Sequence, residues 1–130
     1  MAPDSTDPRW RRAVAATLVL LVAAVVPSPL RRHESWAWLG PDKFLHLVGH
    51  AGYAAVLADA FRAGRCSDEQ AAVLAVTVST GHSLVSGRLQ RWVPGRAFEL
   101  ADVLAGLLGS VLAAGGWYAA HQGSAFSPRR

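Results

Sequence analysis

The chain has 130 residues, of which 52% are hydrophobic and 17% are charged, and its formal net charge is +4. Because its basic residues are scattered between apolar stretches, we expect membrane lipids as partners and no nucleic acid. The single cysteine, Cys66, excludes an internal disulfide and any Cys-x-x-Cys site.

Four stretches of 17 or 18 residues are almost free of charge, with Asp59 the only charged residue among them: Ala13 to Leu30, Phe44 to Phe61, Ala71 to Gly87 and Val103 to Ala120. This length is at the lower end of what a transmembrane helix needs. A soluble helical bundle, the alternative, would show charged faces at the helical period, and these stretches show none. The sequence therefore predicts an all-α fold, an integral membrane bundle of four transmembrane helices near residues 13–30, 42–62, 70–90 and 99–120.

The predicted domain organisation is a disordered leader over residues 1–9, a membrane domain over 10–121 and a disordered tail over 122–130. The first apolar stretch could instead be a signal peptide, with Arg9, Arg11 and Arg12 as its basic flank. It ends in Pro27-Ser28-Pro29 without a small-x-small cleavage site, so we expect an uncleaved helix.

The second helix carries a polar stripe. At about 100° per residue, four side chains share one face, with Lys43 beside the first: Asp42, His46, His50 and Tyr53. Two histidines on such a face can hydrogen-bond to neighbouring helices, whereas the i, i+4 spacing of His46 and His50 would also suit two metal ligands. No glutamate lies between them and no third ligand is apparent, so we expect neither a metal nor another cofactor.

The third and fourth helices each carry a face of small residues. On the third helix this face is hydroxylated, with His82 flanking it: Ser79, Ser83, Ser86, Gly87 and Gln90. On the fourth helix it lies below a carboxylate: Asp102, Gly106, Gly109, Ala113 and Gly116. Small residues let neighbouring helices approach closely in membranes, so both faces predict helix packing.

Asp102 lies about one turn inside the fourth helix, where a carboxylate without a partner is expensive. We expect Arg96 to turn back across Pro94-Gly95 and pair with it, with Gln90 and the second helix closing around the pair; Lys43 is the alternative partner. In a series of four spans, the first and third loops emerge on the same side. That side carries six Lys and Arg against seven on the other, so charge alone does not set the orientation.

Two spaced motifs resemble the VanZ-like family of small prokaryotic membrane proteins. The first is Asp42-Lys43-x-x-His46, and the second runs from Gln90 through Pro94-Gly95-Arg96 and Phe98 to Asp102, with Gly109 further along. The resemblance covers roughly residues 42–109. It implies a multi-pass protein of the cytoplasmic membrane with the motif loops on the outer face. The founding member is associated with low-level resistance to the glycopeptide teicoplanin, and most relatives have no assigned activity.

The chain departs from this family pattern at three positions. Gly87 stands where the family usually has a glutamate, His50 where it often has an aromatic residue, and Gly106 where it has an asparagine. If the missing glutamate were a catalytic acid or base, this chain would be impaired in that role.

Three functions compete. The first is binding of an anionic lipid or envelope-precursor headgroup without turnover, through Lys43, His50, Gln90, Arg96 and Asp102, because arginine forks suit phosphate geometry. The second is a small intramembrane enzyme with His46 as acid or base, Asp42 or Asp102 orienting it and Arg96 stabilising an oxyanion. The third is a purely structural role, in which the charges hold a loop on the bundle.

Overall fold

The computed structural model describes residues 7–26 and 40–125, and its regular structure in these ranges is helical throughout. It contains four helices, α1 (Pro8–Val25), α2 (Pro41–Ala63), α3 (Asp68–Gln90) and α4 (Leu100–Ala125). The predicted all-α fold with four helices is therefore confirmed. Residues 1–6 and 126–130 of the predicted leader and tail lie outside the described residues, while Pro8, Arg9 and residues 122–125 belong to helices.

The ends of α1 differ most from the prediction. It begins at Pro8 rather than near residue 13, because the Asp7 side chain accepts a hydrogen bond from the Arg9 amide (2.8 Å) and caps the first turn. It ends at Val25 rather than near residue 30. Val26 is extended (φ −75°, ψ 133°), as expected for a residue that precedes a proline.

The other helix ends follow local signals in the sequence. Pro41 opens α2 at the first helical position, where the fixed φ of proline suits a helix. Ser67 and Gln70 form a capping box at the start of α3, each side chain bonding to the other's backbone amide. The polar stripe of α2 faces the hydroxylated face of α3, with His50 Nδ1 lying 2.9 Å from Ser79 Oγ.

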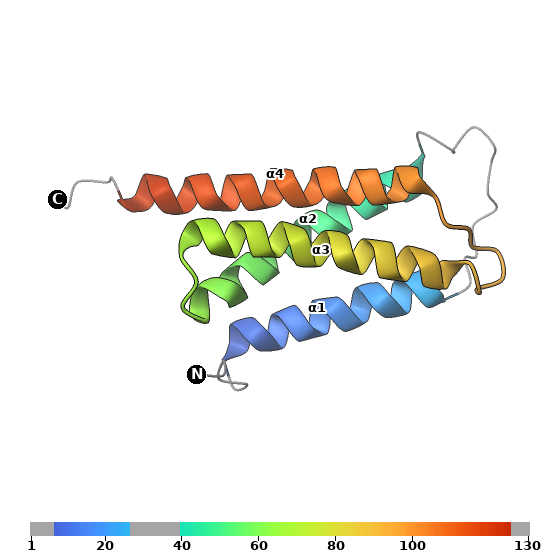
Figure 1. Cartoon of the computed structure of the whole chain (residues 1–130), viewed down its shortest axis with the longest axis horizontal. Helices are drawn as coiled ribbons and strands as arrows, with labels where there is room; N and C mark the ends of the chain where they lie inside the picture. The colour runs from blue at the N-terminus through green and yellow to red at the C-terminus, as the bar shows by residue number, and fades with distance from the viewer. Residues whose placement is uncertain (1–6, 27–39, 126–130) are drawn as a thin grey trace.

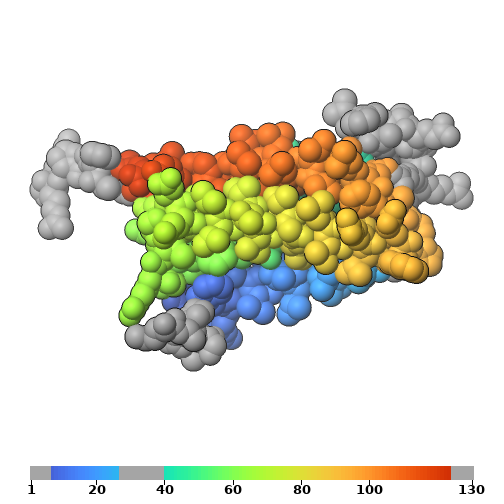
Figure 2. Space-filling model, in the orientation of Figure 1, coloured from blue at the N-terminus to red at the C-terminus, as the bar shows by residue number. Residues whose placement is uncertain are grey.

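The four helices form an up-and-down bundle (Figure 1). α2 packs against all three of the other helices, and α1 rests on α2 and α3. On the face shown in Figure 2, α3 lies between α1 and α4. Val25, Pro41, Gln90 and Leu100 all lie at the same end of the bundle, which we call the motif end.

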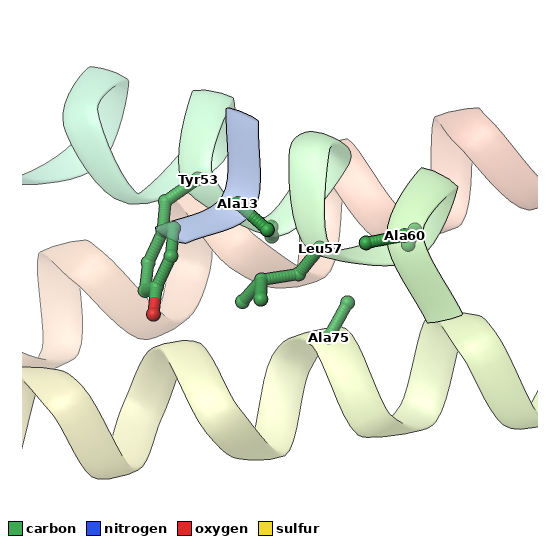
Figure 3. Packing of buried hydrophobic residues seen from close by; sticks show 7 residues of the cluster. Ala13, Tyr53, Leu57, Ala60 and Ala75 are labelled. Carbon is green, nitrogen blue, oxygen red and sulfur yellow. The ribbon is translucent and has the colours of Figure 1, made fainter. Parts of the chain in front are cut away.

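The interior of the bundle is built from small and polar residues. Around Tyr53 and Leu57, the buried hydrophobic cluster is mostly alanine, including Ala13, Ala60 and Ala75 (Figure 3). Ser79 and Ser110 are the largest side chains that are fully buried among the described residues. Large apolar side chains point outward instead, on every helix: Leu18, Val19, Phe44, Val48, Val73, Val85, Leu104 and Leu112.

The predicted small face of α4 contacts α2 along part of its length. A Cβ atom on Gly109 would collide with the backbone of Leu47, and one on Gly106 would lie 3.0 Å from the His50 ring. Here the prediction of close packing is confirmed. At Gly116 it is wrong, because no described atom lies within 4 Å of the corresponding Cβ position.

Two helices, α2 and α4, are long and apolar enough to cross a membrane. Only 33% of the apolar window of α2 and 28% of that of α4 are buried inside the bundle. The core helix of a soluble protein would be mostly buried, so these two helices favour a membrane protein. For α1 and α3, the predicted transmembrane position stays a prediction.

Candidate functional site

An ion cluster centred on Lys43 occupies the motif end. The Lys43 ammonium lies 2.6 Å from Asp42 Oδ2 and 2.8 Å from Asp102 Oδ1, and it also contacts Glu99. The lysine side chain is only 8% exposed. Lys43 enters from the first turn of α2, while Glu99 and Asp102 come from the start of α4, so the cluster ties these two helix ends together.

The partner of Asp102 is therefore Lys43, the alternative that the sequence offered, and the predicted Arg96–Asp102 pair is wrong. Arg96 instead donates from Nε to the Val26 carbonyl (3.1 Å) and from Nη2 to the Ala23 carbonyl (3.0 Å). These carbonyls belong to the last turn and the C-cap of α1, where the helix itself offers no further N–H to bond them. Gly95, with φ +77°, provides the turn that sends Arg96 towards α1 rather than α4.

Oxygens of Asp42, Glu99 and Asp102 lie within 4.8 Å of one another, a spacing that could hold a metal ion. The Lys43 ammonium, however, contacts all three carboxylates. A cation already stands where a metal would bind, so these residues form an ion cluster rather than a metal centre.

His46 lies beside this cluster. Its Nε2 atom is 3.5 Å from Asp102 Oδ2, and its side chain is 26% exposed. The structure thus brings together His46 and Asp102, the pair that acid–base chemistry would require. Their assignment to catalysis stays a prediction.

A cavity of about 260 Å³ opens between α1, α2 and α3 on the other side of His46. Leu20, Ala23 and Ala24 of α1 form its apolar wall. Its polar lining includes five of the predicted site residues, together with His82 and Ser86: Asp42, His46, His50, Gln90 and Arg96. Lys43 and Asp102 do not line this cavity but lie behind Asp42 and His46 in the ion cluster.

Gln90 is the unusual member of the lining. Its side chain is 4% exposed, and its amide makes no hydrogen bond to any described residue. Arg96 retains donors as well, because its two bonds to α1 use two of the five N–H groups of a guanidinium. Both side chains offer unused hydrogen-bonding groups to whatever enters the cavity.

His50 lies one turn deeper and belongs to a buried hydrogen-bond chain. Its Nδ1 atom is 2.9 Å from Ser79 Oγ, which is 2.8 Å from Ser110 Oγ. The Ser110 hydroxyl donates to the Gly106 carbonyl (2.8 Å). Because the Ser110 hydroxyl proton is used in this bond, Ser110 Oγ accepts from Ser79. Ser79 Oγ in turn accepts from His50 Nδ1.

His82 stands opposite His50, with ring centroids 6.0 Å apart, and also contacts the Tyr53 ring. Its Nε2 atom lies 3.2 Å from the Thr17 carbonyl, and since a carbonyl only accepts, Nε2 is the donor. The Tyr53 hydroxyl and Thr17 hydroxyl are 2.7 Å apart. Both contacts tie the deep end of the cavity to α1.

The sequence did not indicate Glu99, Ser110 or Thr17 as part of the site. For Glu99 a signal was present, because it lies three residues before Asp102 and therefore on the same side of the α4 start. Ser110 also follows Gly106 by one turn on the face that packs against α2. Thr17 carried no such signal, since α1 is otherwise apolar in this region.

No family model matches this chain, and no curated protein and no solved structure matches it either. Function is therefore inferred from the geometry of the cavity and its charged surroundings.

Proposed function

We propose that this chain is a multi-pass membrane protein whose cavity at the motif end binds the phosphate-bearing polar headgroup of a lipid or envelope precursor, without turnover. The observation that carries the proposal is Gln90, a buried amide with no described hydrogen-bond partner in a cavity that Arg96 also lines. The amide borders the cavity, so its oxygen and its N–H groups can bond to a ligand there.

The distribution of side chains supports four membrane spans. Large aliphatic residues face outward on α1 and α3 as well as on α2 and α4, for example Leu18 and Val85. A soluble protein rarely exposes so much contiguous apolar surface, whereas alanine and serine interfaces are typical of membrane helices. α3 is less apolar than α2 and α4 because its serines, His82 and Gln90 face the interior.

The proposal includes the VanZ-like resemblance. It places the chain in the cytoplasmic membrane, with the motif end on the outer face. At two of the three departures from the family pattern, Gly87 and Gly106, a neighbouring side chain fills the space beside the glycine. A Cβ on Gly87 would lie 2.8 Å from the Phe98 ring, and one on Gly106 would lie 3.0 Å from the His50 ring. Phe98 and His50 thus occupy the space into which larger side chains at these glycines would extend.

The size and charge of the cavity favour a headgroup as the ligand. Its 260 Å³ is slightly below the range of about 300–1,000 Å³ typical of small-molecule pockets, so it suits a small polar group. Arg88 and Arg91 are exposed near the motif end, where they would attract anionic lipid headgroups. Trp92, 86% exposed, suits the membrane interface.

The test replaces Gln90 by leucine. Because the amide has no described partner, Gln90→Leu should leave the unfolding temperature in detergent unchanged or raise it. Binding of short-chain phosphatidylglycerol, measured by calorimetry on the purified full chain, should weaken about tenfold, as expected for one lost hydrogen bond to a charged group.

Arg12→Gln is the matched control, because Arg12 is exposed and lies near the start of α1, at the end of the bundle opposite the cavity. It should bind short-chain phosphatidylglycerol like the wild-type protein. If wild-type and Gln90→Leu bind equally, or if short-chain diacylglycerol without phosphate binds as well as phosphatidylglycerol, the proposal is wrong. Phosphatidylglycerol and a soluble phosphate ester added separately distinguish a lipid from a free headgroup.

One observation favours an enzyme as the second candidate, namely the 3.5 Å contact between His46 Nε2 and Asp102 Oδ2 beside the cavity. A carboxylate orients a histidine in this way in many general-base sites. Mass spectrometry of bound lipids after incubation would reveal a product. If product forms and Asp102→Asn abolishes it while phosphatidylglycerol still binds, the second candidate replaces the first.

A further inference from the structure

Helices α1 and α2 diverge towards the motif end. At the opposite end they are in contact, because the Trp10 and Phe61 rings pack edge to face with their centroids 5.5 Å apart. Further along, a Cβ atom on Gly49 would lie 3.5 Å from the Leu20 side chain. Beyond this contact, the end of α1 and the start of α2 separate (Figure 1). The cavity at the motif end lies where the two helices separate.

The exposed part of the cavity lining marks its mouth. Among the residues that line the cavity, Ala23 of α1 and Leu45 of α2 are exposed, Leu45 by 62%. On α3, Ser86 and Gln90 are buried and belong to the back wall. The cavity is therefore reached from the side, between α1 and α2, past two apolar side chains.

The groups that can bind a phosphate lie next to this mouth. Arg96 Nη2 donates to the Ala23 carbonyl (3.0 Å), so the guanidinium lies at the edge of the mouth itself. Its remaining N–H groups can bond to phosphate oxygens. Gln90 ends α3 and lies on the back wall at the same end of the cavity. A phosphate held by both side chains would have the mouth directly beside it.

In the proposed membrane, these groups lie at the depths of the matching parts of a phospholipid. The 23 residues of α2 extend over about 34 Å, slightly more than the roughly 30 Å of a bilayer's hydrocarbon core. Gln90, at the end of α3, is then level with the headgroups. Leu45 lies about 6 Å further in, four residues after Pro41, at the edge of the hydrocarbon. A phospholipid has the same order along its length, with phosphate first and acyl carbons next.

We infer that the ligand is a phospholipid that enters the cavity from the side, between α1 and α2. Its phosphate binds Arg96 and Gln90, and its acyl chains stay outside, over Ala23 and Leu45. The inference rests on the proposed function and narrows the ligand from any phosphate-bearing headgroup to one that carries hydrocarbon chains. The volume of about 260 Å³ agrees, because it is below the range of pockets that enclose a drug-sized ligand and leaves no room for the chains.

An apolar groove on the other side of α2 provides an internal comparison. This groove, of about 430 Å³, lies between α2 and α4, and its walls include Phe44, Leu104 and Leu108. Lys43 also lines it, but the Lys43 ammonium already contacts three carboxylates. The groove can accept a hydrocarbon chain, yet among the described residues it offers a phosphate no uncommitted charged group.

The first experiment measures binding by calorimetry to the purified full chain in a maltoside detergent, which carries no phosphate. Short-chain phosphatidylglycerol should bind at least about tenfold more tightly than glycerophosphoglycerol, the same headgroup without acyl chains. This factor corresponds to the burial of about two methylene groups. Ala23→Trp should weaken binding of phosphatidylglycerol at least about tenfold, because the indole would occupy the place where the chains leave the cavity.

Val22→Trp is the matched control for the mouth. Val22 is 57% exposed, does not line the cavity and points about 100° away from Ala23 on the same helix. It adds the same indole at the same end of α1. Val22→Trp should therefore bind phosphatidylglycerol like the wild-type protein.

The second experiment locates the chains without relying on a variant of the mouth. Phosphatidylglycerol with a diazirine near the carbonyl end of one acyl chain is photolysed on the protein, and the adducts are located by mass spectrometry. Adducts should form at Ala23 and Leu45, and Gln90→Leu should reduce them about tenfold, in line with its weaker binding of a charged group. Adducts at Phe44 and Leu104, in the α2–α4 groove, should not depend on Gln90.

The possible failures are distinguishable. If glycerophosphoglycerol binds as tightly as phosphatidylglycerol, or if Ala23→Trp and Val22→Trp bind the lipid equally, the side entrance is wrong while the proposed function stands. Adducts at Phe44 and Leu104 with none at Ala23 or Leu45 would place the lipid in the α2–α4 groove and overturn the inference. If binding of phosphatidylglycerol does not depend on Gln90, the proposed function itself fails.

Discussion

Lys43 shows how one side chain can hold the motif end together. Its ammonium joins Asp42, Asp102 and Glu99 and is almost completely buried. Lys43→Met should destabilise the protein by about 3–5 kcal/mol, because it leaves the largely buried Asp102 carboxylate without the ammonium that contacts it. The free energy of unfolding in detergent, measured by denaturant titration, checks this value.

Two further variants separate the loss of charge from the loss of packing. Arg91→Met removes an exposed cation and should change the free energy of unfolding by no more than about 0.5 kcal/mol. Adding Asp102→Asn to Lys43→Met should recover part of the stability, since one uncompensated charge disappears. A Lys43→Met protein as stable as Arg91→Met would show that the cluster contributes nothing to the fold.

The sequence indicated most of the site residues but not all of their partners. Asp42, His46 and His50 share a face because helical spacing alone places them there, and that part could be predicted. Which cation reaches Asp102 depends on where α1 ends and on the turn at Gly95, which brings Arg96 to the Ala23 and Val26 carbonyls. Such a contact between distant segments leaves no periodic signal in the sequence.

The glycines of α4 allow a test of how closely two helices approach. Gly109→Ala should cost roughly 1–3 kcal/mol, because the new Cβ would collide with the backbone of Leu47 and push α2 away from α4. Gly116→Ala places the same methyl group where no described atom lies within 4 Å. It should stabilise α4 by up to about 1 kcal/mol, the difference in helix propensity between alanine and glycine.

Thermal unfolding of both variants in the same detergent measures this contrast. Opposite signs for the two substitutions would establish that the close α2–α4 contact is at Gly109. A loss of stability at both positions would mean instead that α4 has a further packing partner near Gly116, such as a second copy of the chain.

The helices themselves could be predicted far better than their ends. Uninterrupted apolar stretches located α2, α3 and α4 to within a few residues, because the length and periodicity of a helix are visible in the sequence. The start of α1 depends on the Asp7 side chain, a cap that precedes the apolar stretch by several residues. Its end is determined by Pro27, whose effect falls on the residue before it.

For the whole molecule, the arrangement of side chains is the reverse of that in a soluble bundle. Ser79, Ser110 and a cluster rich in alanine fill the interior, while leucine, valine and phenylalanine cover the outside. Water would disfavour such a surface, but lipid tails would not, and close contact between small residues then supplies the helix packing.

The proposed four-span arrangement predicts where single cysteines can be labelled from outside the cell. The native Cys66 lies in the turn between α2 and α3, at the end of the bundle opposite the motif end. In a Cys66→Ser background, Arg9→Cys and Gly123→Cys lie at that same end, whereas Arg91→Cys lies at the motif end. A membrane-impermeant thiol reagent should label Arg91→Cys in intact cells and the native Cys66, Arg9→Cys and Gly123→Cys only in inverted vesicles. The Cys66→Ser protein without a new cysteine controls for background labelling. Labelling of Cys66 and Arg91→Cys from the same side would refute the spans of α3, and labelling of all four from the outer side would place the bundle on the membrane surface rather than across it.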